Sequence, residues 1–135
     1  MKSPLEMVVS SVRATNADVT DTSALAQRIA DLGEPLYGKL EPSGYPNTGE
    51  AWANTAGIMG RINFATALTS GQVAGVKVDN SRFNFKDPSA VARALLSTAP
   101  SSATMAAIEQ GTQGVEATPS LIASLVISSP DFQRR

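Results

Sequence analysis

The chain contains no histidine and no cysteine. Their absence excludes Ser-His-Asp and Cys-His nucleophile systems, thiolate metal sites and imidazole general bases. It also excludes a disulfide framework and leaves the redox compartment undefined. Catalysis would have to rely on carboxylates, Lys, Tyr, hydroxyl groups and the backbone, a set that few enzymes of this size use alone. We therefore expect a protein that is not an enzyme and that needs no metal and no other cofactor.

Charge of one sign and long apolar runs are also missing. The 11 basic and 12 acidic residues give a formal net charge of -1, whereas a nucleic-acid binder needs a basic face. We therefore expect no nucleic-acid partner. No apolar run approaches the roughly 20 residues of a membrane-spanning helix. Met1 and Lys2 lead straight into a helix start and not into the apolar core of a signal peptide, so we expect no targeting signal and predict no location.

Aromatic residues are scarce, at 5%, while hydrophobic residues make up 42% of the chain. The core must therefore consist mostly of Ala, Val, Leu and Ile, with close packing through Ala and Gly. A length of 135 residues is typical of one domain. We expect residues 1–135 to form a single helical domain.

Proline occurs where helices begin. A hydroxyl residue or Asp stands before proline at four places, and this pair suits the N-cap and first position of a helix. The four pairs are Ser3-Pro4, Asp87-Pro88, Thr118-Pro119 and Ser129-Pro130. They predict an all-α fold, a compact bundle of five or six short to medium helices.

The first two predicted helices carry clear apolar stripes. Ser3 and Glu6 have the spacing of a capping box. The stripe that follows at helical spacing consists of Leu5, Val8, Val9 and Val12. The second helix is predicted to begin at Thr22 and to end at Gly33. Its stripe consists of Leu25, Ile29 and Leu32.

A Pro/Gly-rich loop over Glu34–Gly49 comes next, and it is long for a connection within one domain. We expect Tyr37 and Tyr45 to pin it to the bundle. A helix from about Glu50 to Ser70, capped by Asn47 or Thr48, should follow. Its predicted buried face consists of Trp52, Ala56, Met59, Ile62 or Asn63, and Thr66. Gly57 and Gly60 inside it predict a tight helix crossing.

The period changes between Gly75 and Phe85, where alternating apolar residues predict a short hairpin or an extended arm. Asp79, Asn80 and Asp87 offer oxygen atoms near this segment. Their spacing lacks the pattern of an EF-hand calcium loop, so turns and helix caps are the better interpretation.

Five segments, in order, resemble one large bacterial family, the domain of unknown function numbered eighteen hundred. They are residues 2–13, 32–37, 44–52, 61–65 and 129–135, with sequences such as Leu32-Gly33-Glu34-Pro35-Leu36-Tyr37 and Gly44-Tyr45-Pro46-Asn47-Thr48-Gly49-Glu50-Ala51-Trp52. The resemblance implies that this chain is the C-terminal part of a protein several times longer. It implies no reaction and no catalytic residues. The rest of that longer protein, or another protein, is the partner that we expect.

The loop and the helix after it hold the candidate site residues. Trp52 is either a core anchor or a surface on which a sugar stacks. Glu41 and Glu50 flank Tyr45, and two carboxylates near aromatic rings are what a glycosidase needs. Arg61 is expected to pair with a carboxylate or with carbonyls of Glu34–Gly49, and an anion site is its alternative. Asn63 is a further polar binding candidate.

Two functions remain open. The first is a non-catalytic helical structural or interaction domain that packs on the rest of a larger protein or on a partner. The second is a carboxylate-dependent hydrolase acting on carbohydrate, with Glu50 and Glu41 as its catalytic pair. The two differ in whether Trp52 and both carboxylates line one open cleft or Trp52 is buried. We favour the first.

Overall fold

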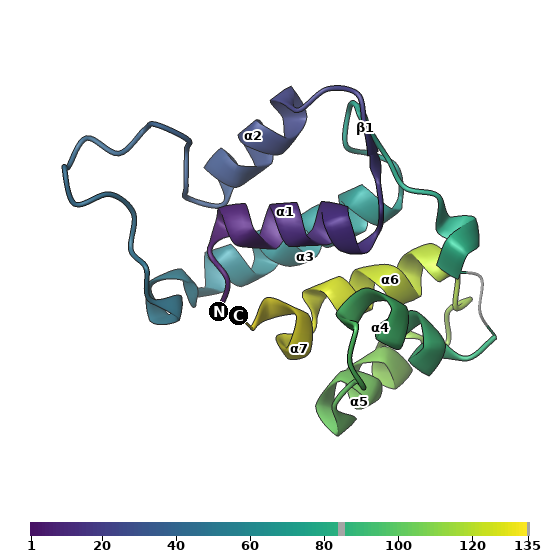
Figure 1. The fold of residues 1–135 in the computed structure, drawn as a ribbon. Helices are drawn as coiled ribbons and strands as arrows, with labels where there is room; N and C mark the ends of the chain where they lie inside the picture. Colours follow the sequence, from purple (N-terminus) through teal and green to yellow (C-terminus); the bar gives the residue numbers. More distant parts are fainter. Residues whose placement is uncertain (84–85, 135) are drawn as a thin grey trace.

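A computed structural model of the chain describes residues 1–83 and 86–134, and these residues are mostly helical (Figure 1). The α-helices are α1 (Pro4–Ala14), α2 (Ser23–Asp31), α3 (Thr55–Thr69), α4 (Pro88–Leu96), α5 (Ser102–Gly111), α6 (Pro119–Ser128) and α7 (Pro130–Gln133). Two 3-10 helices, η1 (Gly49–Trp52) and η2 (Asn80–Phe83), and two strands, β1 (Asp18–Val19) and β2 (Val76–Lys77), complete the described part. The all-α prediction is confirmed. The described helices exceed the predicted five or six because the final turn, α7, is a helix of its own.

The proline-linked helix starts are confirmed. Ser3 Oγ accepts a hydrogen bond from the Glu6 N–H at 3.3 Å, and the Glu6 carboxylate accepts one from the Ser3 N–H at 2.7 Å. This is the reciprocal arrangement of a capping box. The side chains of Asp87, Thr118 and Ser129 likewise cap α4, α6 and α7. Each cap supplies an acceptor to an N–H group that has no partner inside its helix.

Two apolar clusters form the core, and α6 packs against the helices of both because it contacts α3, α4 and α5. The first cluster joins α1, α2 and α3 and contains Met7, Val8, Ile29, Phe64, Ala65, Leu68 and Ile127, among others. The second joins α4, α5 and α6 and contains Val91, Leu95, Ile108, Ile122 and Val126, among others. The two ends of the chain lie side by side (Figure 1).

The predicted apolar stripe of α1 is only partly buried. Met7 and Val8 are enclosed, whereas Leu5 and Val9 are 37% and 38% exposed. The buried residues of α1 include Met7 and Ser11 instead, and the Ser11 hydroxyl donates a hydrogen bond to the Met7 carbonyl at 2.7 Å. A small hydroxyl that bonds its own helix can therefore replace an apolar residue in the core.

The third helix differs from its prediction in both start and face. It begins at Thr55, not Glu50, because the Asn54 side chain accepts a hydrogen bond from the Gly57 N–H at 2.7 Å and caps it there. Its buried residues are Arg61, Phe64, Ala65, Ala67, Leu68 and Thr69, whereas Met59, Ile62, Asn63 and Thr66 are exposed. The helix carries apolar residues on all of its sides. Their spacing in the sequence therefore could not identify the face that packs on α6.

One of the two helix glycines lies at a close approach. A Cβ atom at Gly60 would lie 2.7 Å from Leu32 Cδ2 at the end of α2, whereas one at Gly57 would meet the capping segment of its own helix. The close neighbour of Gly60 is therefore a leucine side chain and not the backbone of a second helix, so the predicted tight helix crossing is not found at either glycine.

The extended segment after Gly75 is confirmed over Val76 and Lys77. Its partner is β1, with Asp18 opposite Lys77 and Val19 opposite Val76 in an antiparallel pair. The chain then turns into η2, and Phe85 lies outside the described residues. The carboxylates of Asp79 and Asp87 accept hydrogen bonds from Ser81 and Ser89, as turn and cap residues do.

Of the two tyrosines in the Glu34–Gly49 loop, Tyr45 makes a hydrogen bond, and this bond joins two parts of the loop itself. The Tyr45 hydroxyl donates a hydrogen bond to the Pro35 carbonyl at 2.7 Å. Tyr37 is fully exposed, so its predicted packing role is wrong. Its backbone has a positive φ of 58° in a turn that the Gly38 N–H closes onto Pro35, and this turn directs the ring into solvent.

Candidate functional site

Trp52 packs under the loop. It is 8% exposed, and its Nε1–H donates a hydrogen bond to the Pro46 carbonyl at 3.1 Å. The ring centroid of Tyr45 lies 6.3 Å away at an interplanar angle of 45°, a favourable tilted geometry. Because most of its surface meets protein, Trp52 presents no open face for a sugar. Trp52 and Tyr45 lie against each other, and each makes a hydrogen bond to a carbonyl of the loop.

The two candidate carboxylates lie at the surface. The Glu41 side chain is 70% exposed and pairs with Lys39 Nζ at 2.9 Å. The hydrogen bond from Lys39 and its charge lower the pKa of Glu41. A glycosidase acid needs a raised pKa instead. Glu50 is exposed on η1. Its catalytic role in the alternative function, a hydrolase, stays a prediction.

Arg61 holds the two ends of the chain together. Its Nη1 donates to the Gln133 Oε1 at 2.6 Å, and its Nη2 donates to the Lys2 carbonyl at 2.7 Å. The carbonyl partner that we expected from the Glu34–Gly49 loop therefore comes from Lys2. Burial lowers the pKa of Arg61, and the charge of Glu34 opposes this shift. Glu34 reaches this region because its carboxylate accepts a hydrogen bond from the Leu5 N–H at 2.8 Å.

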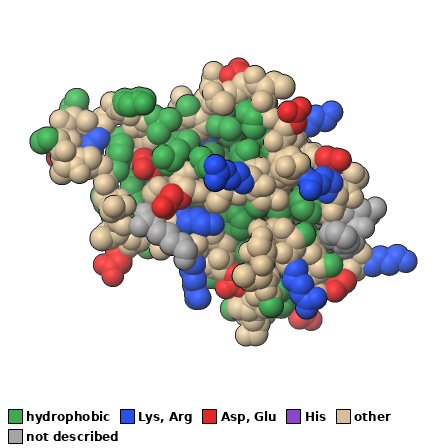
Figure 2. Space-filling view, viewed as in Figure 1, with side chains coloured by type: hydrophobic (Ala, Val, Ile, Leu, Met, Phe, Trp, Pro, Cys, Tyr) green, Lys and Arg blue, Asp and Glu red, His purple; other side chains and the backbone are tan. Residues whose placement is uncertain are grey.

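A largely apolar groove, here named the α1–α2 groove, opens between the first two helices. Its cavity volume is about 330 Å³. The lining residues are Val8, Val9, Val12, Arg13, Thr22, Leu25, Ala26, Ile29 and Leu36. Leu36, at the start of the loop, is 46% exposed. Figure 2 shows hydrophobic side chains gathered on this side of the molecule, over α1, α2 and the start of the loop.

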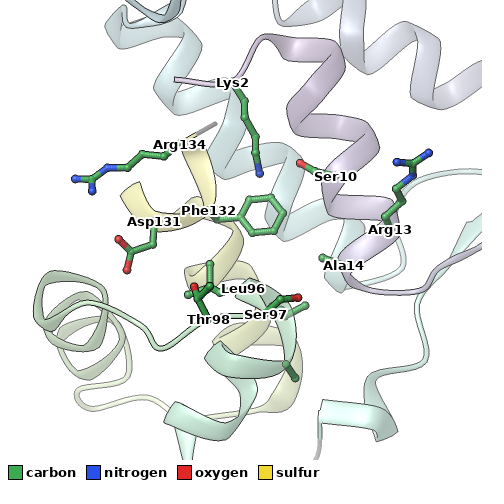
Figure 3. Close-up of a pocket in the computed structure, with 12 residues that line it drawn as sticks. Lys2, Ser10, Arg13, Ala14, Leu96, Ser97, Thr98, Asp131, Phe132 and Arg134 are labelled. Carbon is green, nitrogen blue, oxygen red and sulfur yellow. The ribbon is translucent and has the colours of Figure 1, made fainter.

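A second cavity of about 700 Å³, here named the Lys2 cavity, lies between α1, the end of α4 and α7 (Figure 3). Lys2 Nζ lies 4.1 Å from the centroid of the Phe132 ring, within the range of a cation–π interaction. Burial lowers the pKa of Lys2, and the charge of Glu6 opposes this shift. No sequence pattern indicates this cavity, because a lone Lys near a helix start carries no signal. Lys2 becomes part of a site only because α7 places the ring of Phe132 next to its side chain.

Two further properties concern the described residues alone. Within residues 1–83 and 86–134, no group of three or more acidic residues is arranged to hold a metal ion. The helices in this part of the chain are too short or too polar to cross a membrane.

No curated protein and no solved structure matches the chain. One family model does match, and it covers residues 1–134. The five segments that carried the resemblance lie within this match, apart from the last residue. The chain therefore belongs to the family described as "Protein of unknown function (DUF1800)".

Proposed function

We propose that the chain is a non-catalytic helical interaction domain that binds an amphipathic helix in the α1–α2 groove. The observation that supports this most is the exposure of Leu5 and Val9, at 37% and 38%, on a stripe with the pattern of a core face. A stripe of this kind is expected to be covered. In the isolated chain α2 covers only part of it, and a partner would complete the packing.

The shape and charge of the groove define the partner. An amphipathic helix that binds a groove does so through apolar residues at positions i, i+3 or i+4, and i+7. Arg13 is the only charged residue among those that line the groove. It stands at the end where α1 finishes and α2 begins, with Leu36 toward the other end. The matching helix therefore carries an apolar stripe and a carboxylate that meets Arg13.

We place this helix in the remainder of a longer family protein. Exposed aliphatic side chains are not confined to the groove, since Ile58, Met59 and Ile62 on α3 are 43%, 53% and 39% exposed. Interfaces that form permanently are more hydrophobic than transient ones. Apolar surface on two helices is what we expect of a domain that forms a permanent interface with another part of the same polypeptide chain.

The proposal can be tested with a synthetic amphipathic peptide of about four helical turns. It carries Leu at the anchor positions and Glu at the end that meets Arg13. We expect saturable binding in a nuclear magnetic resonance titration, with shifts of the Val9, Val12 and Leu25 signals. Val9→Asp should weaken binding at least about tenfold, which corresponds to about 1.4 kcal/mol.

The matched control is Val115→Asp. Val115 is 61% exposed and lies in the connection between α5 and α6, outside the groove residues. This variant adds the same charge and removes the same side chain, so it should bind the peptide as the unchanged chain does. An equal loss of peptide affinity in both variants would count against binding in the groove. So would the absence of saturation at about 1 mM peptide, because even a weak complex with a binding free energy of about 4 kcal/mol would form at that concentration.

A further inference from the structure

We propose that the Lys2 cavity binds a small organic carboxylate, with the Lys2 ammonium as its anchor and the apolar walls around Phe132 holding its hydrocarbon part. This ligand site is distinct from the α1–α2 groove, although Arg13 lines both, and it does not depend on the function proposed above. It follows from the position of Lys2, from the composition of the walls, and from the absence of an ion pair to Lys2 within residues 1–83 and 86–134.

Lys2 is held in place before any ligand arrives. Its backbone N–H donates to the Gln133 carbonyl at 2.7 Å, and its carbonyl accepts from Arg61 Nη2 at 2.7 Å. These bonds secure the residue on both sides. The side chain then runs over the ring of Phe132, which is 4% exposed. A charged group that is already positioned binds its ligand with less loss of conformational entropy.

The ammonium retains its capacity to donate hydrogen bonds. Within residues 1–83 and 86–134, Lys2 Nζ makes the ring contact with Phe132 but no hydrogen bond and no ion pair. An ammonium has three donors, and the ring face uses only one side of it. The charge of Glu6 favours the charged form of Lys2 and opposes the lowering of its pKa by burial. An acceptor that enters the cavity would therefore find free donors.

Asp131, the acidic residue in the cavity wall, accepts hydrogen bonds from outside the cavity. Asp131 Oδ2 accepts hydrogen bonds from the Ser101 N–H at 2.8 Å and the Thr104 hydroxyl at 2.7 Å. Figure 3 shows its carboxylate pointing away from Phe132, while Lys2 and Ser10 point inward. The lining residues include three cations, Lys2, Arg13 and Arg134, and one acid, Asp131. This gives the cavity a positive balance within a chain of formal net charge -1.

The remaining walls indicate a carboxylate with an apolar body. Ala14, Ala94, Leu95, Leu96 and Phe132 supply apolar surface. Ser10 and Ser97 supply hydroxyl groups on opposite walls, one from α1 and one from the end of α4. Among the described lining residues, Lys2 points its charged group toward Phe132, whereas the guanidinium groups of Arg13 and Arg134 point away from it (Figure 3). One cation matches a monoanion, whereas phosphate recognition usually recruits Arg forks or several backbone N–H groups.

The test uses the intact chain labelled for nuclear magnetic resonance and three probes: hexanoate, its neutral analogue hexanamide, and inorganic phosphate. We expect hexanoate to shift the signals of Ser10, Ala14 and Ser97 saturably. Hexanamide should bind at least about tenfold more weakly, because it cannot form the ion pair. Inorganic phosphate should bind more weakly than hexanoate, because it has no hydrocarbon part to place against Phe132.

Lys2→Gln should remove the difference between hexanoate and hexanamide, and Lys2→Arg, which keeps the charge, should preserve it. Lys77→Gln is the matched control, since Lys77 is exposed on β2 and lies outside the cavity. An unchanged thermal midpoint in Lys2→Gln would show that the fold is intact, and Lys2→Arg provides the comparison if that midpoint falls. Equal binding of hexanoate and hexanamide, phosphate binding as strong as hexanoate binding, or no saturable shift would each overturn the proposal.

Discussion

Replacing Arg61 by Met tests how the two chain ends are held. The substitution keeps an unbranched stem in α3 but removes the donors to Gln133 Oε1 and to the Lys2 carbonyl, at 2.6 and 2.7 Å. Hydrogen bonds to a charged group contribute about 1.5–3 kcal/mol each. Relief from burying the guanidinium offsets part of this loss. We expect Arg61→Met to lower the free energy of unfolding by about 3–5 kcal/mol, because two such hydrogen bonds amount to about 3–6 kcal/mol and the relief from burial offsets part of that sum.

Urea unfolding followed by circular dichroism measures this loss. With a denaturant slope of about 2 kcal/mol/M, the midpoint should fall by about 1.5–2.5 M. Asn63→Ala is the control, because Asn63 is exposed on the same helix and its loss should stay within about 0.5 kcal/mol. A double-mutant cycle with Gln133→Met should show coupling above about 0.5 kcal/mol. A loss in Arg61→Met no larger than that of Asn63→Ala would refute the reasoning.

Four further predictions concern the core, the loop, the carboxylate of Glu50 and pH. Phe64→Ala should lower the free energy of unfolding by about 3–5 kcal/mol and Met59→Ala by less than about 1 kcal/mol, because Phe64 is buried and Met59 is exposed. If urea unfolding shows similar losses of free energy in the two variants, the buried face of α3 is not the one described above. Trp52→Ala should cost about 3 kcal/mol, at the lower end for a buried aromatic, because Trp52 packs on the loop and belongs to neither core cluster. Glu50→Gln should leave urea unfolding unchanged, and a glycosidase activity that it abolishes would overturn the non-catalytic interpretation. Hydrogen bonds from Ser101 and Thr104 lower the pKa of Asp131 below its usual 3.8, so its ionised form stabilises the fold above that pH and this contribution disappears as pH falls through the lowered pKa. Asp131→Asn should therefore lower the free energy of unfolding more at about pH 7 than at about pH 2, with a difference below about 1 kcal/mol because solvent screens this half-buried group. Equal losses at both pH values in urea unfolding would contradict this assignment.

Helix starts were predictable from the sequence because a cap is local. Ser3 and Glu6 contact groups only three residues away, so their spacing contains the whole interaction. The same holds for the proline that follows each cap. The start of α3 was missed because Asn54 competed with two earlier candidates, Asn47 and Thr48, and the 3-10 turn between them left no pattern.

Long-range pairings were not predictable. Asp18 and Val19 lie in a polar connection, and their partners Lys77 and Val76 lie more than fifty residues away. The place of Lys2 depends equally on distant residues, since α7 supplies the Phe132 ring beneath it. An apolar period shows that a helix has a face to cover but not which neighbour covers it.

The same limit explains the α1–α2 groove. Leu5 and Val9 have the spacing of core residues, which predicts that both are buried. In the structure both are partly exposed, and Val9 lines the groove together with Leu36. The mismatch between an apolar pattern and its exposure became visible only with the fold in hand, and it is the basis of the proposed interaction.

Reversing the charge of Arg13 tests the proposed docking most directly. Two versions of the amphipathic peptide are compared, one with Glu and one with Lys at the position that meets Arg13. The unchanged chain should bind the Glu peptide more tightly, by a factor of at least about ten, because unlike charges attract and like charges repel across an interface. Arg13→Glu should reverse this preference and favour the Lys peptide. An unchanged preference in Arg13→Glu would contradict the placement of a partner helix in the α1–α2 groove.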